Sequence, residues 1–161
     1  FYYYHFEAMG ALVRYSAPSM PEKLEELLYP PFAGVLSNDV QGKTCLISRT
    51  LILTNSTPEF MPYVFQLFAA LLEARPHGPL SDFYKALITP VLSPALWESR
   101  GNVPALARLL SSIIPRAAAD IVAQNQVEPI LGIFQKLMAG KTRTELYGFD
   151  VLEAVITSCD V

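Results

Sequence analysis

The tripeptide Gly42-Lys43-Thr44 is the stretch of this sequence whose residue types come closest to nucleotide chemistry. Gly-Lys-Thr ends the phosphate-binding loop, in which backbone N–H groups and the lysine hold the phosphates of a nucleotide. The complete motif requires a second glycine five residues earlier, following a strand and opening a helix. That position is Ser37, the residues before it have a helical pattern, and those after Thr44 favour an extended chain. We therefore interpret the match as chance and predict no bound nucleotide.

The histidines and a nearby group of glutamates are also poor candidates for catalysis. His5 lies on the aromatic face of a predicted helix, and His77 lies in the break "RPHGP". Neither has a Cys, His or carboxylate at the spacing that metal ligands need. We predict a packed His5 and a loop His77. Glu22, Glu25 and Glu26 are predicted to form a solvated helix face rather than an acid–base pair.

The remaining candidates for chemistry are serines, cysteines and one asparagine. Ser111 and Ser112 lie within a predicted helix and lack the strained turn that exposes a nucleophilic serine. Asn55 opens a glycosylation sequon, which matters only in a secreted chain. Cys45 and Cys159 are the only cysteines, and the predicted order of helices separates them too widely for a disulfide. We expect a reduced, intracellular compartment. The sequence thus predicts no enzyme, no metal and no cofactor.

Composition excludes several classes of function. The chain has 161 residues, is 52% hydrophobic and only 17% charged, and has 12 Lys+Arg against 15 Asp+Glu. A disordered chain is more polar than this, and nucleic-acid binding needs a basic run that is absent. The apolar run "YVFQLFAALL" is too short to span a bilayer, so we predict no membrane insertion. No signal peptide is visible. Because the chain opens and stops inside helical patterns, we interpret it as a fragment of something longer.

Helical periodicity dominates the sequence. Apolar residues recur at three- and four-residue spacing over residues 22–39, 59–74, 102–114, 128–140 and 144–156. Asn102 is a candidate N-cap, Gly140 a helix stop and Trp97 a core anchor. The predicted buried stripes comprise Leu24, Leu27, Leu28, Phe32, Val35 and Leu36; Tyr63, Leu67, Ala70 and Leu71; Val103, Leu106, Leu109, Leu110 and Ile113; and Ile130, Leu131, Phe134 and Leu137.

The predicted helices repeat. An apolar stripe follows each of Pro31, Pro90 and Pro129, in "LLYPPFAGVL", "LITPVLSPAL" and "QVEPILGIFQ". Pro129 follows Pro90 by 39 residues, and Pro90 follows Pro31 by 59, or by 42 when residues 42–58 are set aside. Spacings of roughly 40–47 residues are typical of HEAT and armadillo units. We predict an all-α, right-handed α-solenoid of HEAT-like helical hairpins over residues 1–161, with a proline kinking each second helix.

Several strings resemble one known family. "NDVQ" followed by "EFMPYVFQLFAALLEA", then "PVLSPALWESRGNVPALARLL" and "ILGIFQKLMAGK", closely resembles the CAS-type exportins of the karyopherin-β family. The likeness covers nearly all of the chain except residues 42–58. It implies a HEAT-repeat receptor that binds importin-α together with Ran-GTP in the nucleus and releases both in the cytoplasm after GTP hydrolysis. The resemblance supplies no short motif whose residues can be transferred. The alternative is a HEAT or armadillo scaffold of another assembly.

Residues 42–58 differ from both neighbours. They contain no Asp, Glu or Ala, and threonine recurs in them. Removing them joins Gln41 to Glu59 and restores "NDVQEFMPYVFQ", which the exportin resemblance leads us to expect. Possible codons contain a splice donor at Gly42-Lys43-Thr44, and a branch site and an acceptor further on. We predict an insertion without function, derived from a retained intron and leaving the stack as an exposed loop. The rival interpretation is a functional binding loop.

The polar side of the second helices is the predicted partner surface. Lys85, Glu128, Gln135 and Lys136 lie off the apolar stripes, and we expect them to face the concave side of the solenoid. The exportin resemblance implies that this face binds partners. Glu73 and Arg108, on the predicted outer helices, are expected to have no such role. We call Lys85, Glu128, Gln135 and Lys136 the candidate surface.

Overall fold

The computed structural model describes residues 2–29, 61–75, 78–140 and 143–159. Within these ranges every regular element is a helix and none is a strand, which confirms the predicted all-α class and is consistent with a helical repeat protein. The chain divides into two compact units, residues 1–75 and residues 76–161. The handedness of the predicted solenoid stays a prediction.

The first unit is built on the contact between α1 (Tyr2–Ser16) and α3 (Met61–Ala74). The rings of Phe6 and Tyr63 stack across this contact, with centroids 5.2 Å apart. Residues 21–29 form a further helix, which follows a turn at residues 17–20. α3 supplies most of the buried surface that the structure describes in this unit, through Met61, Val64, Phe65, Leu67, Phe68, Ala69, Leu71 and Leu72.

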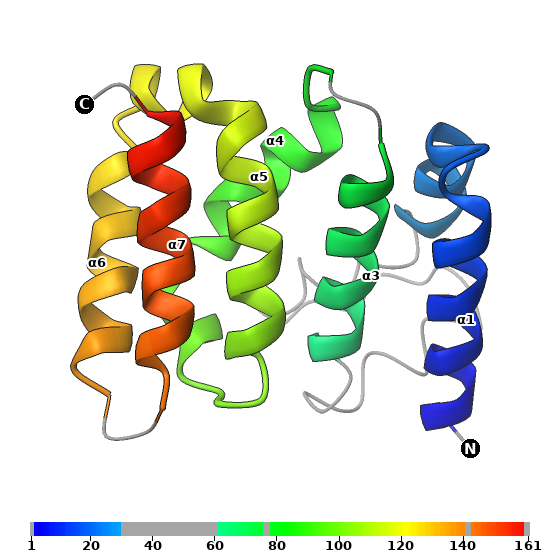
Figure 1. Cartoon of the computed structure of the whole chain (residues 1–161), viewed down its shortest axis with the longest axis horizontal. Coiled ribbons are helices and arrows are strands. Elements are labelled where there is room, and N and C mark those ends of the chain that lie inside the picture. Colours follow the sequence, from blue (N-terminus) through cyan, green and yellow to red (C-terminus); the bar gives the residue numbers. More distant parts are fainter. Residues whose placement is uncertain (1, 30–60, 76–77, 141–142, 160–161) are drawn as a thin grey trace, which may run out of the picture. The chain divides into compact units, whose positions relative to one another are not determined.

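The second unit contains α4 (Asp82–Val91), the 3-10 turn η3 (Pro94–Trp97), α5 (Val103–Ala123), α6 (Val127–Met138) and α7 (Glu145–Ser158). α7 packs against both α5 and α6, and α4 packs against α5 (Figure 1). α6 and α7 form a helical hairpin, in which Thr144 Oγ1 donates a hydrogen bond of 2.8 Å to the carbonyl of Leu137. Gly148 lies against α6 in this hairpin, since a Cβ atom there would lie 3.4 Å from Leu137 Cβ, at van der Waals contact.

The predicted helix 102–114 is too short. α5 continues through Pro115 to Ala123. Proline removes one backbone hydrogen bond within a helix, but Ile114, Ala117 and Ile121 are all buried on the same face. Burial of these three side chains outweighs the lost bond. The predicted stripe from Val103 to Ile113 is buried in full.

The proline pattern does not mark equivalent structural positions, so that part of the repeat prediction is wrong. Pro90 is the second-last residue of α4, whereas Pro129 lies in the first turn of α6. Proline in a first turn replaces an N–H that has no helical partner, and it does not kink the helix. The 39-residue spacing therefore relates the end of one helix to the start of another. Pro31 lies outside the described residues.

Gly132 is a site where substitution should stabilise the fold. It lies within α6, and a Cβ built there meets nothing within 4 Å. Because glycine loses more backbone freedom than alanine when a helix forms, Gly132→Ala should raise the free energy of unfolding by about 0.5–1 kcal/mol. Urea unfolding followed by circular dichroism measures this change. Gly148→Leu is the matched opposite case, because its side chain would overpack against α6 and should destabilise the protein by about 1–3 kcal/mol.

Residues 42–58, the predicted insertion, lie outside the described residues. If they are an insertion without function, deleting them should leave the melting temperature equal or higher. The entropy cost of closing a loop falls slightly when the loop is shortened. Thermal unfolding of the deletion variant measures this directly. Sequencing the spliced messenger RNA provides an independent test, since the codons for residues 42–58 should be missing. A spliced message that keeps them, or a deletion that unfolds the protein, would contradict the insertion.

Candidate functional site

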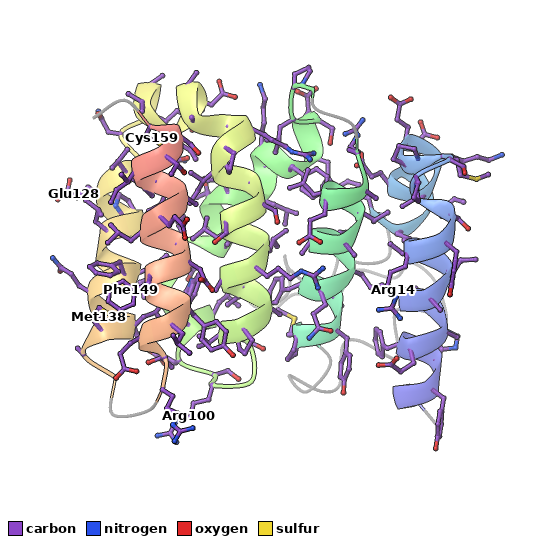
Figure 2. The ribbon with its side chains drawn as sticks, viewed as in Figure 1. Arg14, Arg100, Glu128, Met138, Phe149 and Cys159 are labelled. Carbon is purple, nitrogen blue, oxygen red and sulfur yellow. The ribbon has the colours of Figure 1, made fainter. Side chains whose placement is uncertain are left out.

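The structure places all four residues of the candidate surface on exposed positions of the second unit. Lys85 lies on α4, and Glu128, Gln135 and Lys136 lie on α6. Figure 2 shows Glu128 extending from α6 away from the neighbouring helices. Their position on a concave surface, and their contact with a partner, stay predictions.

Lys85 has a partner within its own unit. Its Nζ atom lies 3.0 Å from Asp120 Oδ2, on α5. The hydrogen bond to Asp120, and then the charge of that carboxylate, raise the pKa of Lys85 above its ordinary value, with a smaller contribution from the charge of Asp82 and a smaller opposing effect of desolvation. Both side chains of the ion pair are more than 40% exposed, so solvent screens it and its contribution to stability is small. The pair connects α4 to α5.

Lys136 is also engaged within the second unit. Its Nζ atom donates a hydrogen bond of 2.9 Å to the carbonyl oxygen of Pro94 and lies 3.6 Å from Glu98 Oε1. These contacts join α6 to the 3-10 turn η3, 42 positions earlier in the sequence. Helical periodicity describes only neighbours within one helix, so it could not have indicated either lysine contact.

The residues between α4 and α5 form a compact connector, which we define as residues 92–102. Trp97 is 4% exposed and Asn102 is 5% exposed. Trp97 Nε1 donates a hydrogen bond of 2.8 Å to the carbonyl of Val91, which confirms Trp97 as a core anchor. Asn102 occupies the N-cap position of α5, but its side chain makes no capping bond. Its Nδ2 atom instead donates a bond of 3.2 Å to the carbonyl of Leu96.

The predictions made for Glu25 and His5, in the first unit, are wrong. Glu25 is not on a solvated face: it is 8% exposed, and Arg75 Nη1 donates a hydrogen bond of 3.1 Å to its Oε2 atom. Arg75 Nη2 also lies 3.5 Å from Oε1 of the exposed Glu22. His5 is exposed rather than packed. His77 lies outside the described residues.

Metal-binding clusters and membrane-spanning helices are both absent from the described part of the chain. There, no three His, Cys, Asp or Glu side chains gather closely enough to hold a metal ion. No helix in the described ranges is both long and apolar enough to cross a membrane. Cys159 is buried near the end of α7 (Figure 2), and Cys45 lies outside these ranges, so their separation stays a prediction.

Two helices display apolar side chains to solvent. Leu146, Phe149 and Ile156 follow one another along α7 and are 69%, 52% and 70% exposed. On α1, Tyr4 and Tyr15 are 76% and 85% exposed. Stripes of this kind are the surfaces on which helices of a repeat protein stack.

Comparison with known proteins identifies relatives along the whole chain. The family model described as "CAS/CSE protein, C-terminus" matches residues 1–161. The importin-alpha re-exporter of Schizosaccharomyces pombe is 44% identical over 160 residues, covering 98% of this chain and 15% of that protein. The Saccharomyces cerevisiae importin alpha re-exporter is 36% identical over 161 residues, covering 100% of this chain and 14% of that protein.

Animal relatives show the same extent of similarity. Human exportin-2 is 35% identical over 161 residues, covering 97% of this chain and 15% of that protein. The chain therefore spans about one seventh of the length of the curated relatives it matches. No solved structure matches it. A family model that covers every residue, together with these identities, shows that the chain belongs to the CAS/CSE protein family.

Proposed function

We propose that this chain is a segment of a nuclear transport receptor that carries importin-α from the nucleus to the cytoplasm in complex with Ran-GTP. The observation that supports this most directly is the 44% identity, over 98% of the chain, to a protein named importin-alpha re-exporter. The all-helical architecture fits a receptor built from stacked helices. Such a protein acts by binding, with no catalysis and no cofactor, and it moves between nucleus and cytoplasm.

The candidate surface gives this function a physical basis within the second unit. Glu128 and Gln135 are exposed on α6, at a spacing of seven residues that places them on one face of the helix. Side chains of this kind give an interface its electrostatic complementarity and its partner specificity. Lys85 and Lys136 would contact a partner only if their bonds within the protein were exchanged or shared.

A pull-down from nuclear extract tests the proposed function. The full-length protein that contains this chain is immobilised and incubated with and without a non-hydrolysable GTP analogue. Importin-α should be retained together with Ran, and only when the analogue is present. A scaffold of a different assembly would retain other proteins regardless of the nucleotide, and that outcome would contradict the proposal.

Charge reversal at Glu128 tests the candidate surface. Glu128→Lys in the full-length protein should weaken binding of importin-α about tenfold, because an interfacial carboxylate is replaced by a repelling charge. Equilibrium binding in the presence of Ran and the GTP analogue measures the effect, which should shrink as salt is raised. Glu73→Lys, on the exposed side of α3, is the matched control. Equal weakening by both variants would mean that the candidate surface is wrongly assigned.

A further inference from the structure

We propose that Lys136 is a positioning residue: it fixes the connector between α4 and α5 to α6 and does not contact the partner. The consequence for partner binding rests on the proposed function above, whereas the fixing of the connector does not. Lys136, one of the four residues of the candidate surface, thereby has a structural role rather than a direct contact with the partner.

Two buried side chains of the connector make hydrogen bonds, one to the end of α4 and one within the connector. Trp97 Nε1 bonds back to the last residue of α4, at Val91, and Asn102 Nδ2 bonds back to Leu96 within η3. Both donors are at most 5% exposed. A buried amide or indole N–H that lost its acceptor would be left desolvated and unbonded, so these bonds are hard to break. The connector thus behaves as a single compact piece attached to α4.

Lys136 attaches this piece to a third helix. Its ammonium bonds the carbonyl of Pro94, the first residue of η3, and lies 3.6 Å from the carboxylate of Glu98, the residue that ends η3. The Lys136 ammonium therefore contacts both ends of the 3-10 turn. The sequence separation of 42 residues makes this a tertiary contact. The side chains of Lys136 and Glu98 are 39% and 73% exposed, so solvent screens their ion pair, and the charge-assisted hydrogen bond to the Pro94 carbonyl is the contact that matters.

This arrangement fixes the spacing between α4 and α6, the two helices of the candidate surface. The connector begins directly after α4 and is bonded to α6 through Lys136. Glu128 and Gln135 on α6 are thereby held at a fixed distance from α4. A surface held in its binding geometry before the partner arrives loses less conformational entropy on binding. A partner carboxylate that approached the Lys136 ammonium would have to compete with, or share it with, both existing contacts.

Hydrogen exchange of the intact chain, without any partner, tests the fixing role. The amides of Leu96 and Glu98 bond to Ser93 and Ala95 within the connector. Lys136→Met keeps the aliphatic stem and removes the donor, so exchange at these two amides should become about tenfold faster. Arg100→Met is the matched control: Arg100 is a basic residue of the same connector whose side chain projects outward (Figure 2), and its removal should leave the same amides unchanged.

Partner binding by the full-length protein then separates positioning from a direct contact. Lys136→Met should weaken importin-α binding about tenfold, with the melting temperature within a few degrees of the parent, and Lys136→Arg, which retains a donor, should recover most of the affinity. Weaker binding with unchanged exchange would show a direct contact, and faster exchange with unchanged binding would show a structural role only; either result overturns the proposal. Absence of binding by the unmodified protein would refute the proposed function instead.

Discussion

Replacing Arg75 with Met should lower the local stability of the first unit by about 3 kcal/mol. The Arg75 and Glu25 side chains are only 17% and 9% exposed, and a hydrogen bond of 3.1 Å joins them. Removing one member of a buried ion pair leaves the other charge in a poorly solvated site without its strongest partner. Met retains most of the apolar stem of Arg75. The loss of stability would therefore come from the missing charge and hydrogen bond rather than from lost packing.

Native-state hydrogen exchange at the amides of α3 measures this loss within the unit concerned, because it gives the free energy of opening residue by residue. Glu22→Gln is the control. Glu22 is 82% exposed and 3.5 Å from the same guanidinium, so its neutralisation should change stability by less than about 0.5 kcal/mol. The double variant Arg75→Met with Glu25→Leu should recover part of the loss, since it leaves no buried charge. Similar effects of Arg75→Met and Glu22→Gln would contradict the assignment.

The burial of Glu25 shows how far periodicity alone could predict this helix. Positions 21, 24, 25 and 28 share one face of a helix, and all four are buried or half-buried in the structure, as is the adjacent Tyr29. Hydrophobicity instead favoured Leu27 as a stripe residue, yet Leu27 is 64% exposed. The helix is rotated from the predicted orientation because Arg75, 50 positions later, makes a charged residue tolerable inside. No local pattern contains that information.

The exposure of the residues of the candidate surface was predictable to a similar degree. Helical spacing predicted correctly that Glu128, Gln135 and Lys136 lie on the exposed side of α6. It also predicted that Leu131 is buried, which is wrong, because Leu131 is 37% exposed. What the sequence could not indicate is that Lys136 reaches a backbone carbonyl of η3. The short turn η3 has no periodicity of its own, and its position depends on packing of Trp97 and Asn102. Contacts between distant elements are therefore what the structure adds.

Replacing Trp97 with Ala should have the largest effect of any single change considered for the second unit, about 3–5 kcal/mol. Trp97 is 4% exposed, so truncation removes a large buried aromatic surface and opens a cavity at the connector. It also leaves the carbonyl of Val91, at the end of α4, without the 2.8 Å hydrogen bond from the indole. The connector would then lose its buried side-chain hydrogen bond to α4.

Trp97→Phe separates the two contributions to this loss. It retains most of the buried aromatic surface and removes the N–H donor, so it should cost about 1–2 kcal/mol. Leu146→Ala on α7 is the control, because Leu146 is 69% exposed and surface changes usually stay within about 0.5 kcal/mol. Urea unfolding must be followed by circular dichroism, since Trp97 is the only tryptophan and its fluorescence disappears in both variants. If Trp97→Ala were no more destabilising than Leu146→Ala, the connector would not be the fixed element that positions α4 against α6.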